Sequence, residues 1–153
     1  MAEIMFYHLE HKPWEQVLPR QLATALERGW RCVVQIGQDE RVEEVSEILW
    51  KNEADAFLTH GTKADGKADR QPIWLTADAD NPNSATVRFF IEGAAIGDVA
   101  GLTRAAILFD GRDEAAVATA RTDWKRLKAE GHEISYWQQD ENHRWQNKSK
   151  AEN

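Results

Sequence analysis

The chain has 153 residues, of which 42% are hydrophobic and 29% charged, and these proportions are typical of a globular domain. Its length favours one domain over two, and a chain of this size buries enough surface to fold without disulfide or metal cross-links. Nineteen lysines and arginines against 26 aspartates and glutamates give a net charge of -7, which disfavours tight binding to nucleic-acid phosphates.

The predicted elements of the first half alternate between strand and helix. Strands are expected at residues 4–9 and 30–36, which are rich in β-branched, aromatic and other apolar side chains. Between them, helical spacing predicts a short turn at 14–18 and a main helix at 19–28, because proline fits a first turn and breaks a helix interior. Residues 41–50 are expected to form an amphipathic helix with three glutamates on its polar face.

The second half begins with a polar run, residues 61–71, which is expected to be an exposed and mobile loop. Further strands are predicted at residues 73–76, 87–91, 105–109 and 134–138. The longest helix is expected at 113–130, with Asp113 as its N-cap. The last residues, 140–153, are polar apart from Trp145 and are expected to form a flexible tail.

This alternation of strands and helices predicts the fold class α/β. We expect one Rossmann-like three-layer sandwich at residues 1–139, with a mainly parallel sheet covered on both faces, followed by the tail at 140–153. The first strand is not followed by Gly-x-Gly-x-x-Gly, so the dinucleotide fingerprint is absent.

No other motif for a cofactor or for catalysis is complete. The segment from Gly61 to Ala68 is similar to a phosphate-binding loop, but it ends in alanine where Mg²⁺ needs a hydroxyl, and Pro72 follows where a helix is needed. The five histidines lack metal-ligand spacing, and no serine or cysteine lies in a nucleophile-elbow setting. We expect no cofactor, no metal and no catalytic residue. A nucleotide-dependent enzyme using the loop from Gly61 to Ala68 is the alternative.

The cellular location follows from what the sequence lacks. The single cysteine, Cys32, cannot form a disulfide within the chain and is compatible with a reducing compartment. The first residues lack the features of a signal peptide, and no apolar stretch approaches the roughly 20 residues of a membrane helix. We therefore expect a cytoplasmic protein that makes no membrane contact.

The longest helix carries cations beside a tryptophan. At about 100° per residue, Trp124 lies at one edge of the core-facing side. Three cations border this edge: Arg121, Lys125 and Lys128. An indole beside cations on an acidic protein is a candidate site for an acidic, partly aromatic peptide. A solvated flank whose cations favour the helix dipole is the alternative, and spacing alone favours it. A third interpretation, direct binding of single-stranded nucleic acid through Trp and Arg side chains, is disfavoured by the net charge.

Short segments, in order along nearly the whole chain, resemble one known family. They are Phe6-Tyr7-His8-Leu9, Leu18-Pro19-Arg20, Gly29-Trp30-Arg31, Leu49-Trp50, Phe57-Leu58-Thr59-His60-Gly61, Arg70-Gln71-Pro72-Ile73, Leu108-Phe109-Asp110-Gly111, Ala120-Arg121-Thr122-Asp123-Trp124-Lys125, Gly131-His132 and Tyr136-Trp137-Gln138-Gln139. As an ordered set they resemble the chi subunit of bacterial DNA polymerase III, a clamp-loader accessory protein. The chain departs from the family pattern at Thr59, where the family usually has proline.

This resemblance implies a noncatalytic adaptor in DNA replication. It implies that the chain joins the clamp loader through the psi subunit and binds the acidic C-terminal tail of single-stranded-DNA-binding protein, with only indirect DNA contact. The residues that correspond to the tail site are Arg121, Trp124, Lys125 and Lys128, with Leu18 at the edge of its pocket. The candidates for the psi-facing surface are Trp50, Phe57 and Trp74, each of which is equally consistent with core packing.

Overall fold

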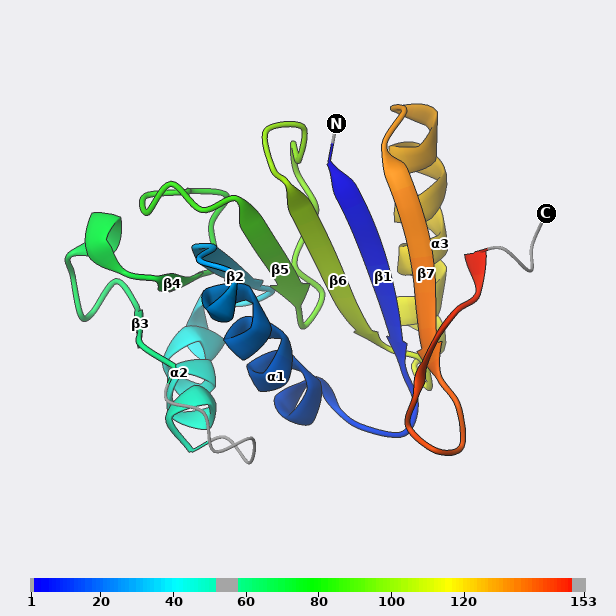
Figure 1. The fold of residues 1–153 in the computed structure, drawn as a ribbon, viewed down its shortest axis with the longest axis horizontal. Coiled ribbons are helices and arrows are strands. Elements are labelled where there is room, and N and C mark those ends of the chain that lie inside the picture. Colours follow the sequence, from blue (N-terminus) through cyan, green and yellow to red (C-terminus); the bar gives the residue numbers. More distant parts are fainter. Residues whose placement is uncertain (1, 52–57, 150–153) are drawn as a thin grey trace.

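The computed structural model describes residues 2–51 and 58–149, which form one mixed sheet with helices on both faces (Figure 1). The strands are β1 (Glu3–Leu9), β2 (Cys32–Ile36), β3 (His60–Gly61), β4 (Ile73–Thr76), β5 (Val87–Ile91), β6 (Arg104–Asp110), β7 (Glu133–Gln139) and β8 (Trp145–Asn147). The helices are α1 (Trp14–Glu27), α2 (Val42–Trp50) and α3 (Glu114–Ala129), with short 3₁₀ turns at Asp39–Arg41 and Ala68–Arg70.

The sheet order is β3-β4-β2-β5-β6-β1-β7-β8, and every neighbouring pair is parallel except β7 and β8. Parallel neighbours cannot be joined by a tight hairpin, and α1 and α3 lie in two of the crossovers that join the strands instead. The predicted α/β class and the mainly parallel sheet are therefore confirmed.

The side chains of β1 show how the core is divided between the two faces of the sheet. Met5 and Tyr7 belong to the apolar cluster under α1 and α2, whereas Ile4 and Phe6 belong to the cluster under α3. Successive side chains of a strand point to opposite faces, and both sets are apolar here because helices cover both faces. Figure 1 shows α1 and α2 in front of the sheet and α3 behind it.

α1 is one continuous helix, although the sequence predicts a turn and then a separate helix starting at Pro19. The helix begins directly after Pro13 and contains Pro19 in its second turn. A proline there has no N–H for the carbonyl four residues earlier, which costs one helical hydrogen bond. Val17, Leu18 and Pro19 itself are buried, so packing against the sheet offsets that loss.

The residues after β7 form a hairpin, although the sequence predicts a flexible tail from residue 140. The carboxylate of Asp140 closes the turn by accepting hydrogen bonds from the backbone N–H groups of Asn142 (2.8 Å) and Arg144 (3.0 Å). β8 then pairs with β7, and Trp145 packs edge-to-face on Tyr7 with ring centroids 5.0 Å apart. The one large apolar side chain of the segment is what attaches it to the core.

Candidate functional site

The predicted cationic stripe lies on the flank of α3 that faces β1 and β7. Trp124 is half-buried, with its ring centroid 5.6 Å from that of Phe6 on β1 and 5.9 Å from that of Tyr136 on β7. Arg121, Lys125 and Lys128 are exposed beside it. The structure therefore brings together the four α3 residues of the predicted site.

Local sequence fixes the orientation of this helix. Asp113 caps it by accepting hydrogen bonds from the backbone N–H groups of Ala115 (3.0 Å) and Ala116 (3.3 Å), as the sequence predicts. Ala120 and Leu127 are buried in the cluster against β1 and β6. With these residues anchored, the polar flank has to face solvent.

The cations of α3 differ in what they contact. Arg126 binds within the fold, with ion pairs to Asp123 (3.8 Å) and Glu130 (3.3 Å) and a hydrogen bond to the carbonyl of Ile96 (3.0 Å). Within residues 2–51 and 58–149, Arg121 and the two lysines of the stripe form no ion pair. These three charges are therefore free to meet carboxylates from another molecule.

Leu18 does not share a pocket with Trp124, and this part of the sequence prediction is wrong. The side chain is fully buried in the cluster under α1 and α2. Trp124 packs against the other cluster, on the opposite face of the sheet. The helical spacing of Leu18 was the signal of a core position.

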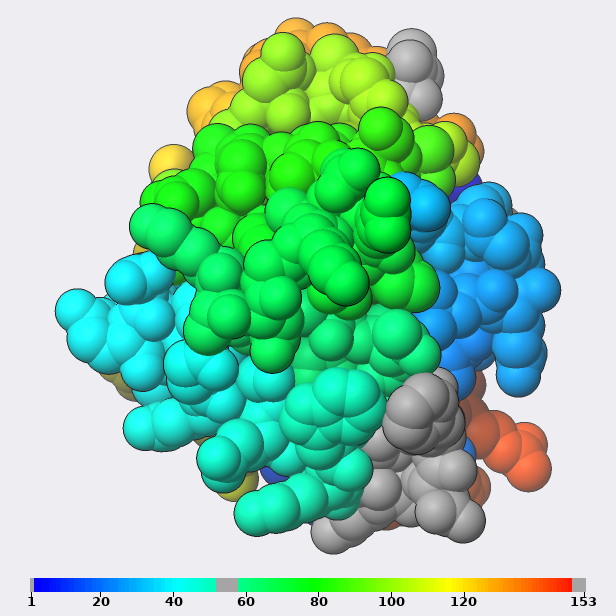
Figure 2. Space-filling model, turned by 90° about the vertical axis from the view of Figure 1, so that its left-hand side faces the viewer, coloured from blue at the N-terminus to red at the C-terminus, as the bar shows by residue number. Residues whose placement is uncertain are grey.

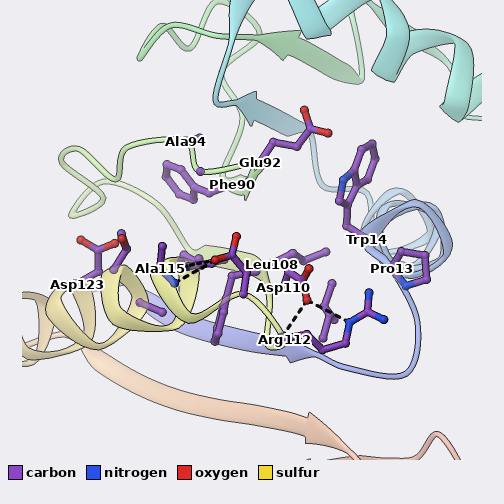
Figure 3. Close-up of a pocket in the computed structure, with 18 of the residues that line it drawn as sticks. Pro13, Trp14, Phe90, Glu92, Ala94, Leu108, Asp110, Arg112, Ala115 and Asp123 are labelled. Atoms are coloured by element: carbon purple, nitrogen blue, oxygen red, sulfur yellow. Dashed lines mark hydrogen bonds and ion pairs between the residues drawn. The ribbon is translucent and has the colours of Figure 1, made fainter.

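A cavity of about 590 Å³ lies on the other flank of α3, at the carboxyl ends of β1, β5 and β6 (Figure 3). Open α/β sheets commonly bind ligands at this edge. Carboxylates dominate its rim, and three of them make contacts within the fold: Asp113 caps α3, Asp110 accepts from the backbone N–H of Arg112 (2.9 Å), and Glu92 forms a two-pronged ion pair with Arg41 (2.9 and 2.7 Å). An acidic rim repels the phosphates of a nucleotide.

The segment from Gly61 to Ala68 also lacks the geometry of a phosphate-binding loop. Asp65 accepts a hydrogen bond from the backbone N–H of Thr62 (2.8 Å), and Glu43 accepts one from the Thr62 hydroxyl (2.7 Å), so donors that a phosphate would need are already occupied. Most of residues 61–71 are exposed, as the sequence predicts, and only the first two, Gly61 and Thr62, are buried. A three-residue 3₁₀ turn follows at Ala68–Arg70, where phosphate binding requires the N-terminus of a helix. The structure gives the nucleotide-dependent alternative no support.

The candidates for the psi-facing surface lie in different environments. Trp50, at the end of α2, is 51% exposed. Its ring centroid lies 4.2 Å from the ring centroid of the buried His60. Trp74 is only 5% exposed, packs with Val33 and Ala85, and donates from Nε1 to Asp80 (3.2 Å). It is therefore a core residue and offers no contact surface. Phe57 lies outside the described residues.

One group of aromatic residues comes together only in the folded protein and was not predicted from the sequence. Trp30, Trp137 and Trp145 line a single groove of about 340 Å³ on the α1 face of the sheet. They are far apart in the chain, so no local spacing relates them. The only signal in the sequence is the total of seven tryptophans in 153 residues.

The fold and the α3 flank define a class of protein: a single α/β sandwich that presents cationic and aromatic side chains on the outside of a helix. A family model, DNA polymerase III chi subunit, HolC, matches residues 1–135. The chain belongs to this family of DNA polymerase III subunits, which places it in DNA replication and confirms the resemblance found in the sequence.

A relative from Rickettsia prowazekii (strain Madrid E), named probable DNA polymerase III subunit chi, is 25% identical over 91 residues. The match covers 60% of this chain and 55% of the relative, so it spans about half of that protein's length. No helix among the described residues is long and apolar enough to cross a membrane.

Proposed function

We propose that the protein is a noncatalytic accessory subunit that links the clamp loader of DNA polymerase III, through the psi subunit, to the acidic C-terminal tail of single-stranded-DNA-binding protein. The observation that carries this proposal is the exposed stripe of Arg121, Lys125 and Lys128 beside Trp124 on a chain of net charge -7. Family membership supports the polymerase setting.

The chemistry of the stripe suits an acidic peptide that ends in an apolar residue. Guanidinium and ammonium groups pair with side-chain carboxylates and with a terminal carboxylate, and Arg121 can do so with two parallel hydrogen bonds. The half-buried indole of Trp124 offers an apolar surface next to these charges. Binding is expected in the micromolar range, which corresponds to about -8 kcal/mol.

The test is fluorescence anisotropy of a labelled acidic C-terminal peptide from the cognate single-stranded-DNA-binding protein. Arg121→Ala and Lys125→Ala are each expected to weaken binding about 5- to 30-fold, because each removes a charge-assisted contact worth about 1–2 kcal/mol. Arg126→Ala is the matched control, since it removes a cation from the same helix that already binds Asp123 and Glu130. Equal effects of all three substitutions, or none from the first two in folded protein, would contradict the proposal.

The second contact is proposed for the exposed face of Trp50. α2 lies at the β3–β4 end of the sheet (Figure 2), whereas α3 lies at the β1–β7 end (Figure 1). Two partners at opposite ends of the molecule do not compete. Trp50→Ala is expected to abolish co-purification with psi and to leave the tail peptide affinity unchanged, while Arg121→Ala does the reverse. If either variant lost both the co-purification with psi and the affinity for the tail peptide, the proposal of two separate sites would be contradicted.

A further inference from the structure

The groove of about 340 Å³ lies between α1 and the β7–β8 hairpin, on the sheet face opposite α3. Its lining includes Met5 and Tyr7 of β1 and Arg104 and Ala106 of β6, two strands that lie side by side in the sheet (Figure 1). We call it the tryptophan groove and define it by Trp30, Trp137, Trp145, Arg20, Gln21 and Arg104. Trp145 lies beyond both the family match, which ends at residue 135, and the segments that carry the family resemblance.

The three indoles are held in place by the fold. Trp137 donates from Nε1 to the hydroxyl of Ser135 (2.8 Å), which satisfies its polar atom. Trp145 packs edge-to-face on Tyr7, whose pKa is raised to about 12 by burial, so the phenol adds no negative charge. Rigid aromatic rings that line a cleft are the usual platform for stacking a flat ring.

The groove is cationic on an acidic protein. Arg104 lies over the ring of Trp30, 5.2 Å from the ring centroid, and Arg28 lies 5.0 Å from the same centroid. Arg104 also pairs with Glu3 at 3.2 Å, the one carboxylate that binds a groove cation in the described residues. Arg20 is exposed and forms no ion pair there, so its charge is open to a ligand.

Two polar atoms of the groove are buried without a partner: Nε of Arg104, a donor, and Oε1 of Gln21, an acceptor. Buried polar groups are nearly always hydrogen-bonded, and Arg104 and Gln21 both line the groove, so small rotations of their side chains would offer a donor and an acceptor to a bound ligand. A carboxylate or a phosphate only accepts. The edge of a nucleobase carries both kinds of group on a flat ring, and a nucleotide adds a phosphate for Arg20.

We propose that the tryptophan groove binds one base of single-stranded nucleic acid, stacked among Trp30, Trp137 and Trp145, with the adjacent phosphate held by Arg20. The cavity volume lies at the lower end of the range of about 300–1,000 Å³ for small-ligand sites, which suits one nucleotide. This site is independent of the α3 stripe, which lies on the other face of the sheet.

The test is anisotropy of a labelled 12-nucleotide single strand titrated with the full chain at low salt. Saturable binding is expected with a dissociation constant of about 10⁻⁴ to 10⁻⁶ M, and it should weaken as salt rises. Trp145→Ala and Arg20→Ala are each expected to weaken it about 5-fold or more. Arg20→Ala should also reduce the slope of log K against log salt by about 0.7. Trp145→Phe, which keeps an aromatic ring, should retain most of the binding and guards against a folding defect.

Arg121→Ala is the matched control, because it removes an exposed cation from the opposite face. It should leave oligonucleotide binding unchanged, and Arg20→Ala should leave the acidic tail peptide affinity unchanged. The proposal is overturned if no saturable binding occurs, if Arg20→Ala and Arg121→Ala have equal effects, or if the acidic peptide displaces the oligonucleotide from the groove. If the protein binds the acidic peptide but not the oligonucleotide, the groove proposal fails and the proposed adaptor function is unaffected.

Discussion

Replacing Leu18 with alanine separates a core role from a role in peptide binding. The side chain is fully buried under α1, and deleting such a leucine costs about 2–5 kcal/mol through lost burial and the cavity that remains. At about 3 kcal/mol, and about 2–4 °C of melting temperature per kcal/mol for a domain of this size, the melting temperature should fall by about 6–12 °C. If the wild type has only about 5 kcal/mol of stability, the variant still has about 2 kcal/mol and stays more than nine-tenths folded.

The assay combines urea denaturation with anisotropy of the acidic tail peptide, both well below the melting temperature. Leu18→Ala should lower the free energy of unfolding and leave peptide affinity per folded molecule unchanged. Leu127→Ala, equally buried on the α3 face, is the control for a core deletion beneath the stripe itself. A large loss of affinity in Leu18→Ala without a loss of stability would refute the placement of Leu18 away from the site.

Two further predictions concern single ionisable groups. Burial raises the pKa of the Cys32 thiol to about 12, so a thiol reagent at pH 8 should modify it only at the rate of global unfolding, and rapid modification of native protein would contradict its place in the core. A hydrogen bond from the backbone N–H of Arg144 holds the pKa of Asp140 below its ordinary value. The ionised carboxylate therefore stabilises the β7–β8 turn fully at pH values above its unfolded pKa of about 4. This stabilisation is lost as the pH falls through the lower pKa of the folded state. The NMR signal of the Trp145 indole should report that transition below about pH 4 in wild type and not in Asp140→Asn; identical titrations would contradict it.

The sequence predicted the elements whose pattern is local. The strand at residues 73–76 and the strand at residues 87–91 match β4 and β5, and the predicted helix at 113–130 exceeds α3 by one residue at each end. In each of these segments, hydrophobic periodicity and turn or cap residues agree. The four α3 residues of the candidate site share one helix, so helical spacing alone was enough to group them.

What the sequence did not reveal depends on contacts between distant segments. Pro19 breaks a helix by its intrinsic preference, and only the packing of α1 on the sheet overrides that preference. β8 is short and polar, and it is held by its pairing with β7 and by the packing of Trp145 on Tyr7 of β1, which is distant in the chain. The tryptophan groove joins three segments that no periodicity connects, and the burial of Trp74 depends on Val33 and Ala85 from other elements.

Both outer strands of the sheet are very short, and this limits how the molecule can associate. β3 has two residues and β8 has three, and β8 pairs with only the last three of the seven residues of β7. A long uncovered strand is a template on which another chain can add its own backbone, and short outer strands remove that template. Strand addition is therefore disfavoured along the parts of each edge that β3 and β8 cover, which favours recognition of this subunit through side chains on its helices and loops. The β7–β8 hairpin thus also shields the last three residues of β7 from pairing with a second copy of the chain.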